Sequence, residues 1–398
     1  MSSETAVAVR LKLKPRQEDR LLAGHAWIFS NEIAEVPEGV AAGDVVEVVS
    51  AAGQRLGAGF YNPASLIACR IVARAGQPVD EEFFRRKLGA ALEYRQARFP
   101  GATSYRLCFG ESDGLPGLVI DRYGDILVMQ VLSAGIEARL ELVGAALRSL
   151  LSPKGIYLKN DHRLRALEGL KAECRVLSGE VPESCVIEES GLKYRVPLRE
   201  GQKTGFYFDQ RENREFLRPY FKGQRVLDLY CYVGAFGLNA AKYGAASVFG
   251  VDSSQAAVTL AKENAQLNGL DARFEIGDAE DALKAFGEAG DQKAQPTMIL
   301  LDPPSLVPSK KHLPKALRAY AKLNTLALKA LGRGGLLATS TCSNHVSREL
   351  FVDMLRQAQA KAGRPTRLAA LRGQGSDHPI LLAMPETEYL HFALLEVL

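Results

Sequence analysis

The chain has 398 residues, 47% of them hydrophobic and 24% charged, and its formal net charge is +4. At about 150 residues per domain, this length predicts two or three globular domains. No segment approaches the roughly 18 unbroken apolar residues of a membrane span, and residues 1–5 lack the apolar core of a signal peptide, so we expect a cytoplasmic protein.

The six cysteines form no CxxC pair and no metal-ligand spacing with the histidines. We therefore expect free thiols in a reducing compartment and no metal site. The small positive charge permits an anionic partner without requiring one.

Residues 1–75 are expected to form a small β-barrel. The run 6–16 alternates between apolar side chains and the basic residues Arg10, Lys12 and Lys14, which is the period-2 pattern of a half-buried strand. Residues 1–74 contain eight Lys or Arg and eight Asp or Glu, so the pattern favours a solvated face over an RNA-binding one. Further β-rich runs follow at 45–49, 56–61 and 66–72.

Residues 76–197 are expected to form a linker helix at 81–99 and an α+β module. The module reads as strand, strand, helix, strand and strand, with the last strand at 186–196. Its first turn contains Asp113, Asp121 and Arg122. Aspartate in a turn usually bonds to its own backbone, so these three residues are not assigned to catalysis.

From residue 198 to 398, strands and helices alternate, which predicts a doubly wound, mostly parallel α/β sheet. Two late β-rich runs, around Leu368 and at 390–396, are expected to complete this sheet. The five earlier strands are expected at 225–229, 247–251, 272–276, 297–301 and 335–340.

The first strand of this part ends in a glycine turn that opens a helix. Asp228 precedes Gly234 and Gly237, and the GxGxxG pattern of a pyrophosphate site is absent, so a nucleoside ligand fits better than a dinucleotide. The second strand ends in Asp252, which is suited to the ribose hydroxyls or to capping the next helix. The third leads to Asp278, at the expected position of an adenine edge. Three acids at three successive strand ends predict S-adenosylmethionine as the cofactor.

Two further groups reach the same edge of the sheet. Asp302 follows the fourth strand in an Asp-Pro-Pro motif, and Cys342 follows the fifth. Because ligands bind at the carboxyl ends of parallel strands, we expect a carboxylate and a thiol in one crevice. This pair predicts covalent catalysis on an electrophilic ring carbon.

The string Gly-Gln-Lys-Thr-Gly-Phe-Tyr-Phe-Asp-Gln-Arg at 201–211, followed by the turn at 228–237, Asp-Pro-Pro-Ser at 302–305 and Thr-Cys-Ser at 341–343, resembles the bacterial cytosine-5 methyltransferases of large-subunit (23S) ribosomal RNA. The resemblance covers essentially the whole chain. It implies a PUA-like N-terminal barrel that binds RNA and a class I, Rossmann-like methyltransferase domain at 198–398. The activity it implies is methylation of cytosine at C5.

The resemblance also implies roles for individual residues. Cys342 would attack C6 of a flipped cytosine, and Asp302 would hold the N3 and N4 edge of the base. Lys203, Tyr207 and Phe208 would line the RNA channel, with Arg10, Lys12 and Lys14 as further RNA contacts. The cofactor contacts would be Phe208, Gln210, Asp228, Tyr230, Gly234, Phe236, Asp252, Asp278 and Asp302.

Many cytosine-5 RNA methyltransferases have a second cysteine after the Asp-Pro-Pro-type motif, but this chain has Ser305. We therefore assign the nucleophile to Cys342 alone. Cys231 is expected to pack against the first helix, and His345 to lie at the surface.

Two other functions remain open: methylation of a base nitrogen, as in relatives acting on guanine, with Cys342 structural, and a non-catalytic assembly factor. The target nucleotide, the preference for naked RNA or a particle, the group that removes the C5 proton and a homodimeric state are not specified by the sequence.

Overall fold

In the computed structural model, residues 9–36, 38–201, 204–288, 295–307 and 309–398 are described. The chain divides into two compact units. The first comprises residues 1–185, 197–206 and 377–387, and the second comprises 186–196, 207–376 and 388–398. Among the described residues, no helix is long and apolar enough to cross a membrane.

The first unit begins with a six-stranded sheet in the order β2-β6-β5-β4-β1-β3. The alternation predicted for 6–16 holds within β1, where Leu11 and Leu13 are buried in the core of this sheet, whereas Val9 is exposed and residues 6–8 lie outside the described residues. The helix α1 spans Asp19–Leu22. The strands are β1 (Arg10–Leu13), β2 (Trp27–Ile28), β3 (Ile33–Glu35), β4 (Val45–Val49), β5 (Arg55–Tyr61) and β6 (Cys69–Ala73).

The rest of this unit is a five-stranded sheet in the order β11-β10-β9-β8-β7, and apolar side chains of the helices α2 and α4 belong to its core. The elements are α2 (Glu81–Arg98), β7 (Ser104–Phe109), β8 (Leu118–Tyr123), β9 (Ile126–Val131), α3 (Ala134–Glu137), α4 (Leu140–Leu151), β10 (Gly155–Asn160) and β11 (Glu173–Gly179). The sequence analysis missed β7 and β11, whose sequences are interrupted by charged residues.

The run predicted to close this sheet forms a separate hairpin instead. β12 (Ser184–Glu189) pairs only with β13 (Leu192–Pro197) among the described strands, and residues 186–196 belong to the second unit. The buried Glu189 accounts for the difference, since it forms ion pairs with Arg211 at 2.9 Å and Arg214 at 2.7 Å. Both arginines lie on α5 (Arg211–Leu217) of the second unit.

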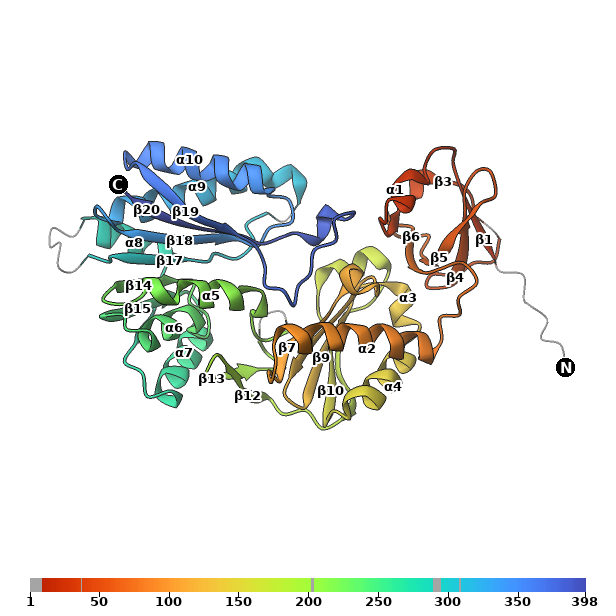
Figure 1. Cartoon of the computed structure of the whole chain (residues 1–398), viewed down its shortest axis with the longest axis horizontal. Helices are drawn as coiled ribbons and strands as arrows, with labels where there is room; N and C mark the ends of the chain where they lie inside the picture. The colour runs from red at the N-terminus through yellow and green to blue at the C-terminus, as the bar shows by residue number, and fades with distance from the viewer. Residues whose placement is uncertain (1–8, 37, 202–203, 289–294, 308) are drawn as a thin grey trace. The chain divides into compact units, whose positions relative to one another are not determined.

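The second unit is built on a seven-stranded sheet in the order β16-β15-β14-β17-β18-β20-β19 (Figure 1). The first five strands of this order run parallel, whereas β20 is antiparallel to both of its neighbours, which confirms the predicted doubly wound, mostly parallel sheet. The strands are β14 (Arg225–Leu229), β15 (Ser247–Asp252), β16 (Arg273–Ile276), β17 (Met298–Leu301), β18 (Leu336–Thr341), β19 (Thr366–Arg372) and β20 (His391–Val397).

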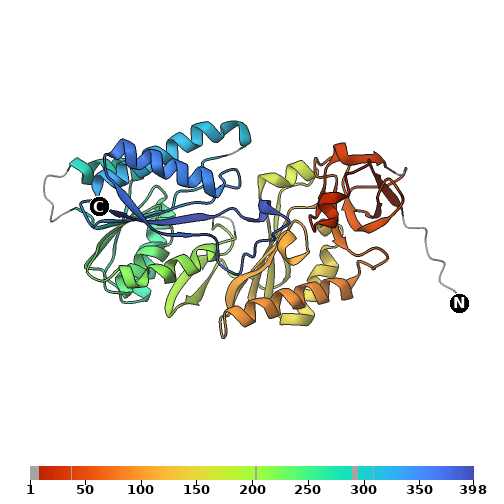
Figure 2. The same ribbon diagram turned by 45° about the horizontal axis from the view of Figure 1, so that its top comes forward.

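Helices cover both faces of this sheet, which explains why its strands are apolar without alternation (Figures 1 and 2). On β17, Ile299 and Leu301 pack in a core with α8, α9 and α10, while Met298 and Leu300 pack in a second core with α5 and α6. The helices after α5 are α6 (Ala235–Lys242), α7 (Gln255–Leu267), α8 (Ala279–Glu288), α9 (Leu313–Ala330) and α10 (Arg348–Ala362).

Candidate active site

The turn after β14 has an unusual backbone. Tyr230, Tyr232 and Gly234 all adopt positive φ angles, of 61°, 48° and 80°. Bulky residues rarely occupy this left-handed region, and such strain is typical of functional sites. At Gly234, a Cβ atom would lie 3.0 Å from the Phe274 ring, so both the angle and the space require glycine. The turn brings bare backbone to the carboxyl end of the sheet, as a nucleoside ligand needs.

Asp228, on β14, bonds to the start of α6 and so holds the turn between these two elements. Its side chain is 1% exposed, and its Oδ2 accepts the backbone N–H of Gly237 at 2.8 Å. The pKa of Asp228 is raised to about 8, chiefly because burial removes the carboxylate from water. The like charges of Asp302 and Asp252 add to the increase, and the Gly237 hydrogen bond opposes it.

This raised pKa predicts a dependence of stability on pH. Between about pH 4 and pH 8 the unfolded chain loses the Asp228 proton, whose ordinary pKa is 3.8, while the folded chain keeps it. The free energy of unfolding should therefore fall as pH rises through this window, and Asp228→Asn should remove that contribution. Urea unfolding of both proteins from pH 5 to pH 9 measures it. If the free energy of unfolding changes with pH in the same way for both proteins below pH 8, the raised pKa of Asp228 is contradicted.

Asp252 ends β15 and joins two turns. Its Oδ2 accepts the N–H of Tyr232 at 3.0 Å, and its Oδ1 accepts the N–H of Ser254 at 2.9 Å. A carboxylate has about four acceptor positions, so two positions are left for hydroxyl groups of a ligand. Asp278 is exposed and accepts the N–H groups of Glu280 at 2.8 Å and Asp281 at 3.1 Å, so it caps α8. Capping accounts for Asp278 without a cofactor.

Asp302 follows β17 and is held by two neighbours. Ser340, on the adjacent strand β18, donates its hydroxyl to Asp302 Oδ1, and Gln210 Nε2 donates to the same oxygen at 3.0 Å. The parallel register of β17 and β18 pairs Leu301 with Thr339, which places Ser340 beside Asp302. Gln210 was predicted to contact the cofactor, but its contact within the structure is with the Asp302 carboxylate.

Cys342 lies two residues beyond Ser340 and is partly exposed. Two tyrosines connect it with Asp302. Burial raises the pKa of Tyr320 to about 12, and burial also raises the pKa of Tyr207; both phenols further interact electrostatically with Cys342 and with Asp302. The thiol and the carboxylate thus both influence the same two phenols, and the adjacent parallel strands β17 and β18 precede them.

Tyr320, on α9, was missed by the sequence analysis. Its hydroxyl accepts the N–H of Leu306 at 3.0 Å and donates to the carbonyl of Pro304 at 3.2 Å, so it anchors the loop of the Asp-Pro-Pro motif. No local pattern marks it, because Tyr320 is eighteen residues away from Asp302 in sequence and reads as an ordinary core position of an amphipathic helix.

The aromatic residues assigned to the site divide into two groups. The Tyr207 ring lies edge to face with Tyr232, 5.3 Å between centroids, beside the cofactor turn. Phe208 and Phe236 are instead buried, and Phe236 packs in the core with α5 and α6. Phe236 also lines a small void together with Asp302 and Ser340, so the contacts predicted for Phe208 and Phe236 with the cofactor or RNA stay predictions.

Cys231 lies near Gly250 of β15, and His345 lies at the surface as expected. Cys231 is buried, and burial raises its thiol pKa well above the ordinary value, which suits packing rather than nucleophilic attack. Ser305 and His345 are exposed.

The basic side chains of β1 all have partners within their own unit. Arg10 pairs with the buried Glu47 at 3.1 Å, and Lys12 lies 3.7 Å from Glu35. Lys14 donates to the carbonyl of Asn31 at 2.7 Å. These contacts favour the solvated strand face. Lys203, the remaining residue predicted to contact RNA, lies outside the described residues.

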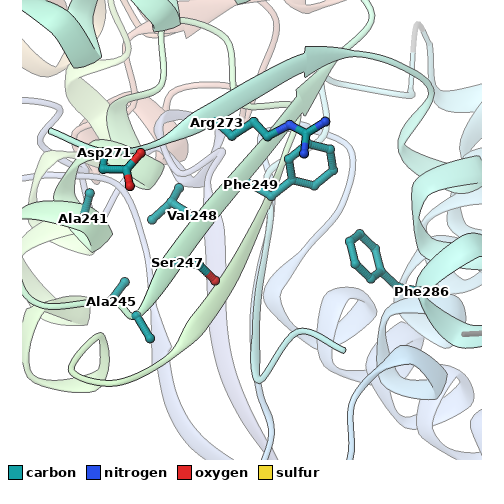
Figure 3. A pocket seen from close by; sticks show the side chains of 9 residues that line it. Ala241, Ala245, Ser247, Val248, Phe249, Asp271, Arg273 and Phe286 are labelled. Atoms are coloured by element: carbon teal, nitrogen blue, oxygen red, sulfur yellow. The ribbon is translucent and has the colours of Figure 1, made fainter. Parts of the chain in front are cut away.

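A hollow of about 540 Å³ lies near the amino ends of β15 and β16, away from the carboxyl ends where Asp252 and Asp302 lie (Figure 3). Its lining includes Ser247 and Arg273, which begin β15 and β16, and the rings of Phe249 and Phe286. Arg273 stacks over Phe249 at 5.5 Å and also pairs with Glu275. Because sheets of this kind bind ligands at the carboxyl ends of their strands, we place the cofactor at Asp252 and not in this hollow.

Comparison with known proteins identifies the types of domain in this chain. Residues 133–359 match the family model of S-adenosylmethionine-dependent methyltransferases, and residues 11–74 match that of the PUA-like domain. Fold and site together thus define an S-adenosylmethionine-dependent methyltransferase with an N-terminal PUA-like domain. The predicted cofactor and domain types are confirmed.

The full-length relatives are more specific. The chain is 44% identical over 382 residues to ribosomal RNA large subunit methyltransferase I of Aeromonas hydrophila, covering 94% of this chain and 96% of that protein. It is 37% identical over 391 residues to the protein of the same name from Escherichia coli O139:H28, covering 96% and 98%. The chain belongs to the family of ribosomal RNA large subunit methyltransferase I.

Solved structures share the whole fold. A SAM-dependent methyltransferase from Streptococcus mutans superimposes with a TM-score of 0.83 at 24% identity, covering 98% of this chain and 100% of that one. A methyltransferase complexed with SAH gives a TM-score of 0.84 at the same identity and coverage.

Proposed function

We propose that this protein transfers a methyl group from S-adenosylmethionine to C5 of a cytosine in 23S ribosomal RNA, with Cys342 as the nucleophile. The relatives' name supports ribosomal RNA of the large subunit as the substrate. The position of Cys342 is the observation that favours C5 over a base nitrogen as the target. Tyr207 and Tyr320 both interact electrostatically with the Cys342 thiol and with the Asp302 carboxylate.

The chemistry of cytosine explains the need for a thiol. C5 is too weakly nucleophilic to accept a methyl group directly, so the Cys342 thiolate forms a bond to C6 and the ring electrons shift through C5 toward C4 and N3. C5 then has enamine character. The cofactor supplies an electrophilic methyl group. Loss of the C5 proton to a base afterwards restores the C5–C6 double bond and expels the thiolate.

Asp302 is assigned to the Watson–Crick edge of the base. A carboxylate beside N4 accepts its N–H and so holds the base in the orientation needed for attack at C6. Because a cytosine within folded RNA cannot reach a crevice of this kind, the base must be extruded first. Tyr207, beside the cofactor turn, offers an aromatic surface for it.

The nucleoside product separates this function from methylation of a base nitrogen. Unmodified 23S ribosomal RNA made by transcription is incubated with the protein and S-adenosylmethionine carrying a labelled methyl group, then digested to nucleosides. Labelled 5-methylcytidine is the expected product. Labelled methylguanosine would show instead that the protein methylates guanine. If the protein binds the cofactor but transfers no methyl group, the result would favour a non-catalytic assembly factor.

A further inference from the structure

A line of hydrogen bonds runs from Asp302 to an arginine on β19. Gln210 Nε2 donates to Asp302 Oδ1 at 3.0 Å, and Gln210 Oε1 accepts from Asn213 Nδ2 at 2.7 Å. Asn213 Oδ1 in turn accepts from Arg372 Nε at 3.0 Å. Gln210 is 2% exposed and Asn213 is fully buried, so water does not compete for these groups.

The direction of each bond is set by the two ends of this line. A guanidinium has only donors and a carboxylate has only acceptors. Asn213 must therefore turn its oxygen to Arg372 and its amide N–H groups to Gln210, and Gln210 must turn its own amide N–H groups to Asp302. If either side-chain amide turned over, two donors or two acceptors would face each other at both of its contacts.

Further hydrogen bonds hold Asn213, Gln210 and Ser340 in place. Asn213 Nδ2 donates to the Gly373 carbonyl at 3.1 Å, and Gln210 Nε2 donates to Ser340 Oγ at 3.3 Å while Ser340 donates to Asp302. The void beneath Asp302 has a volume of only about 10 Å³, room for one water at most. Asp302 thus has two donors on one oxygen, and these hold its carboxylate in one orientation.

We propose that Gln210, Asn213 and Arg372 form a polarity relay that positions the Asp302 carboxylate for the target base. The inference rests on the proposed function, since it takes Asp302 as the group that holds the base. Gln210, Asn213 and Arg372 are positioning residues, not catalytic ones.

The test uses Asn213→Asp, which keeps shape and the Arg372 contact but can no longer donate to Gln210. The Gln210 amide should then turn over and present its oxygen to Asp302. We expect kcat for methyl transfer to ribosomal RNA to fall about 10- to 100-fold, the size of a lost charge-assisted hydrogen bond. KM for S-adenosylmethionine should stay within about twofold. Gln210→Met should lower kcat similarly, and adding Asn213→Asp to it should lower kcat no further.

Asn239→Asp is the matched control. Asn239 is also buried in this unit, and its Nδ2 donates to Tyr194 and to Ala235 instead of to the relay. It should lower the melting temperature as Asn213→Asp does but leave kcat near wild type. A normal kcat in both Asn213→Asp and Gln210→Met would overturn the relay.

Asp302→Asn, measured in parallel, separates the two claims. If Asp302→Asn is inactive while both relay variants are normal, only the relay is wrong. If Asp302→Asn keeps the wild-type rate, the role proposed for Asp302 is wrong and the relay has nothing to position. If Asp302→Asn and the relay variants all lose kcat with KM preserved, both claims are supported.

Discussion

Cys342→Ala is expected to lower methyl transfer to ribosomal RNA by about 10⁴-fold or more, because loss of the nucleophile removes the covalent route altogether. Cofactor affinity should be nearly unchanged, since Asp252, at which we place the cofactor, ends β15 and Cys342 follows β18. RNA binding should also persist. Single-turnover rates with labelled cofactor, together with calorimetric cofactor titrations, measure both quantities.

The matched control is Cys174→Ala, which removes an exposed thiol from the first unit. It should leave the rate at the wild-type value. A Cys342→Ala protein that methylates cytosine at a normal rate would refute covalent catalysis, and one that loses cofactor binding as well would show that Cys342 has a structural role in the second unit.

Asp252→Ala is expected to weaken S-adenosylmethionine binding by about 10- to 100-fold. The two ribose hydroxyls would lose an ionised acceptor, and a hydrogen bond to a charged group contributes about 1.5–3 kcal/mol. The Tyr232 and Ser254 N–H groups lose a partner too, so the turn after β14 should loosen. Isothermal titration with the cofactor measures the affinity, and filter binding measures RNA affinity, which should change little.

Asp271→Ala is the control variant. Asp271 is an exposed carboxylate of the same unit, and it lines the hollow near the amino ends of β15 and β16. Cofactor affinity should be unchanged in this variant. If Asp271→Ala weakens binding and Asp252→Ala does not, the cofactor occupies the hollow and the assignment to Asp252 is wrong.

The parts of the site that follow from strand order were predictable from sequence. Asp252, Asp302 and Cys342 each come directly after a strand of a parallel sheet, and such strands deliver their ends to one edge whatever the loop lengths. The same rule gave the doubly wound fold. The PUA-like domain and the cofactor, in contrast, were expected partly from resemblance to a known family.

The parts that depend on side-chain packing were not predictable. Gln210 and Phe236 lie within motifs assigned to the cofactor, yet one bonds to Asp302 and the other is buried in the core. Tyr320 and Arg372 contribute from distant elements with no local pattern. Similarly, the hairpin of β12 and β13 left its predicted sheet because Glu189 pairs with arginines more than twenty residues away.

The central claim is that Cys342 bonds to C6 of a cytosine, and a trapped adduct tests it most directly. Ribosomal RNA transcribed with 5-fluorocytidine is incubated with the protein and S-adenosylmethionine. Fluorine cannot leave C5 as a cation, so elimination is blocked and the bond between sulfur and C6 should survive denaturation. We expect a protein–RNA adduct that maps to the peptide containing Cys342 and is absent in Cys342→Ala. Methylated RNA without any adduct, or an adduct at another residue, would contradict the account.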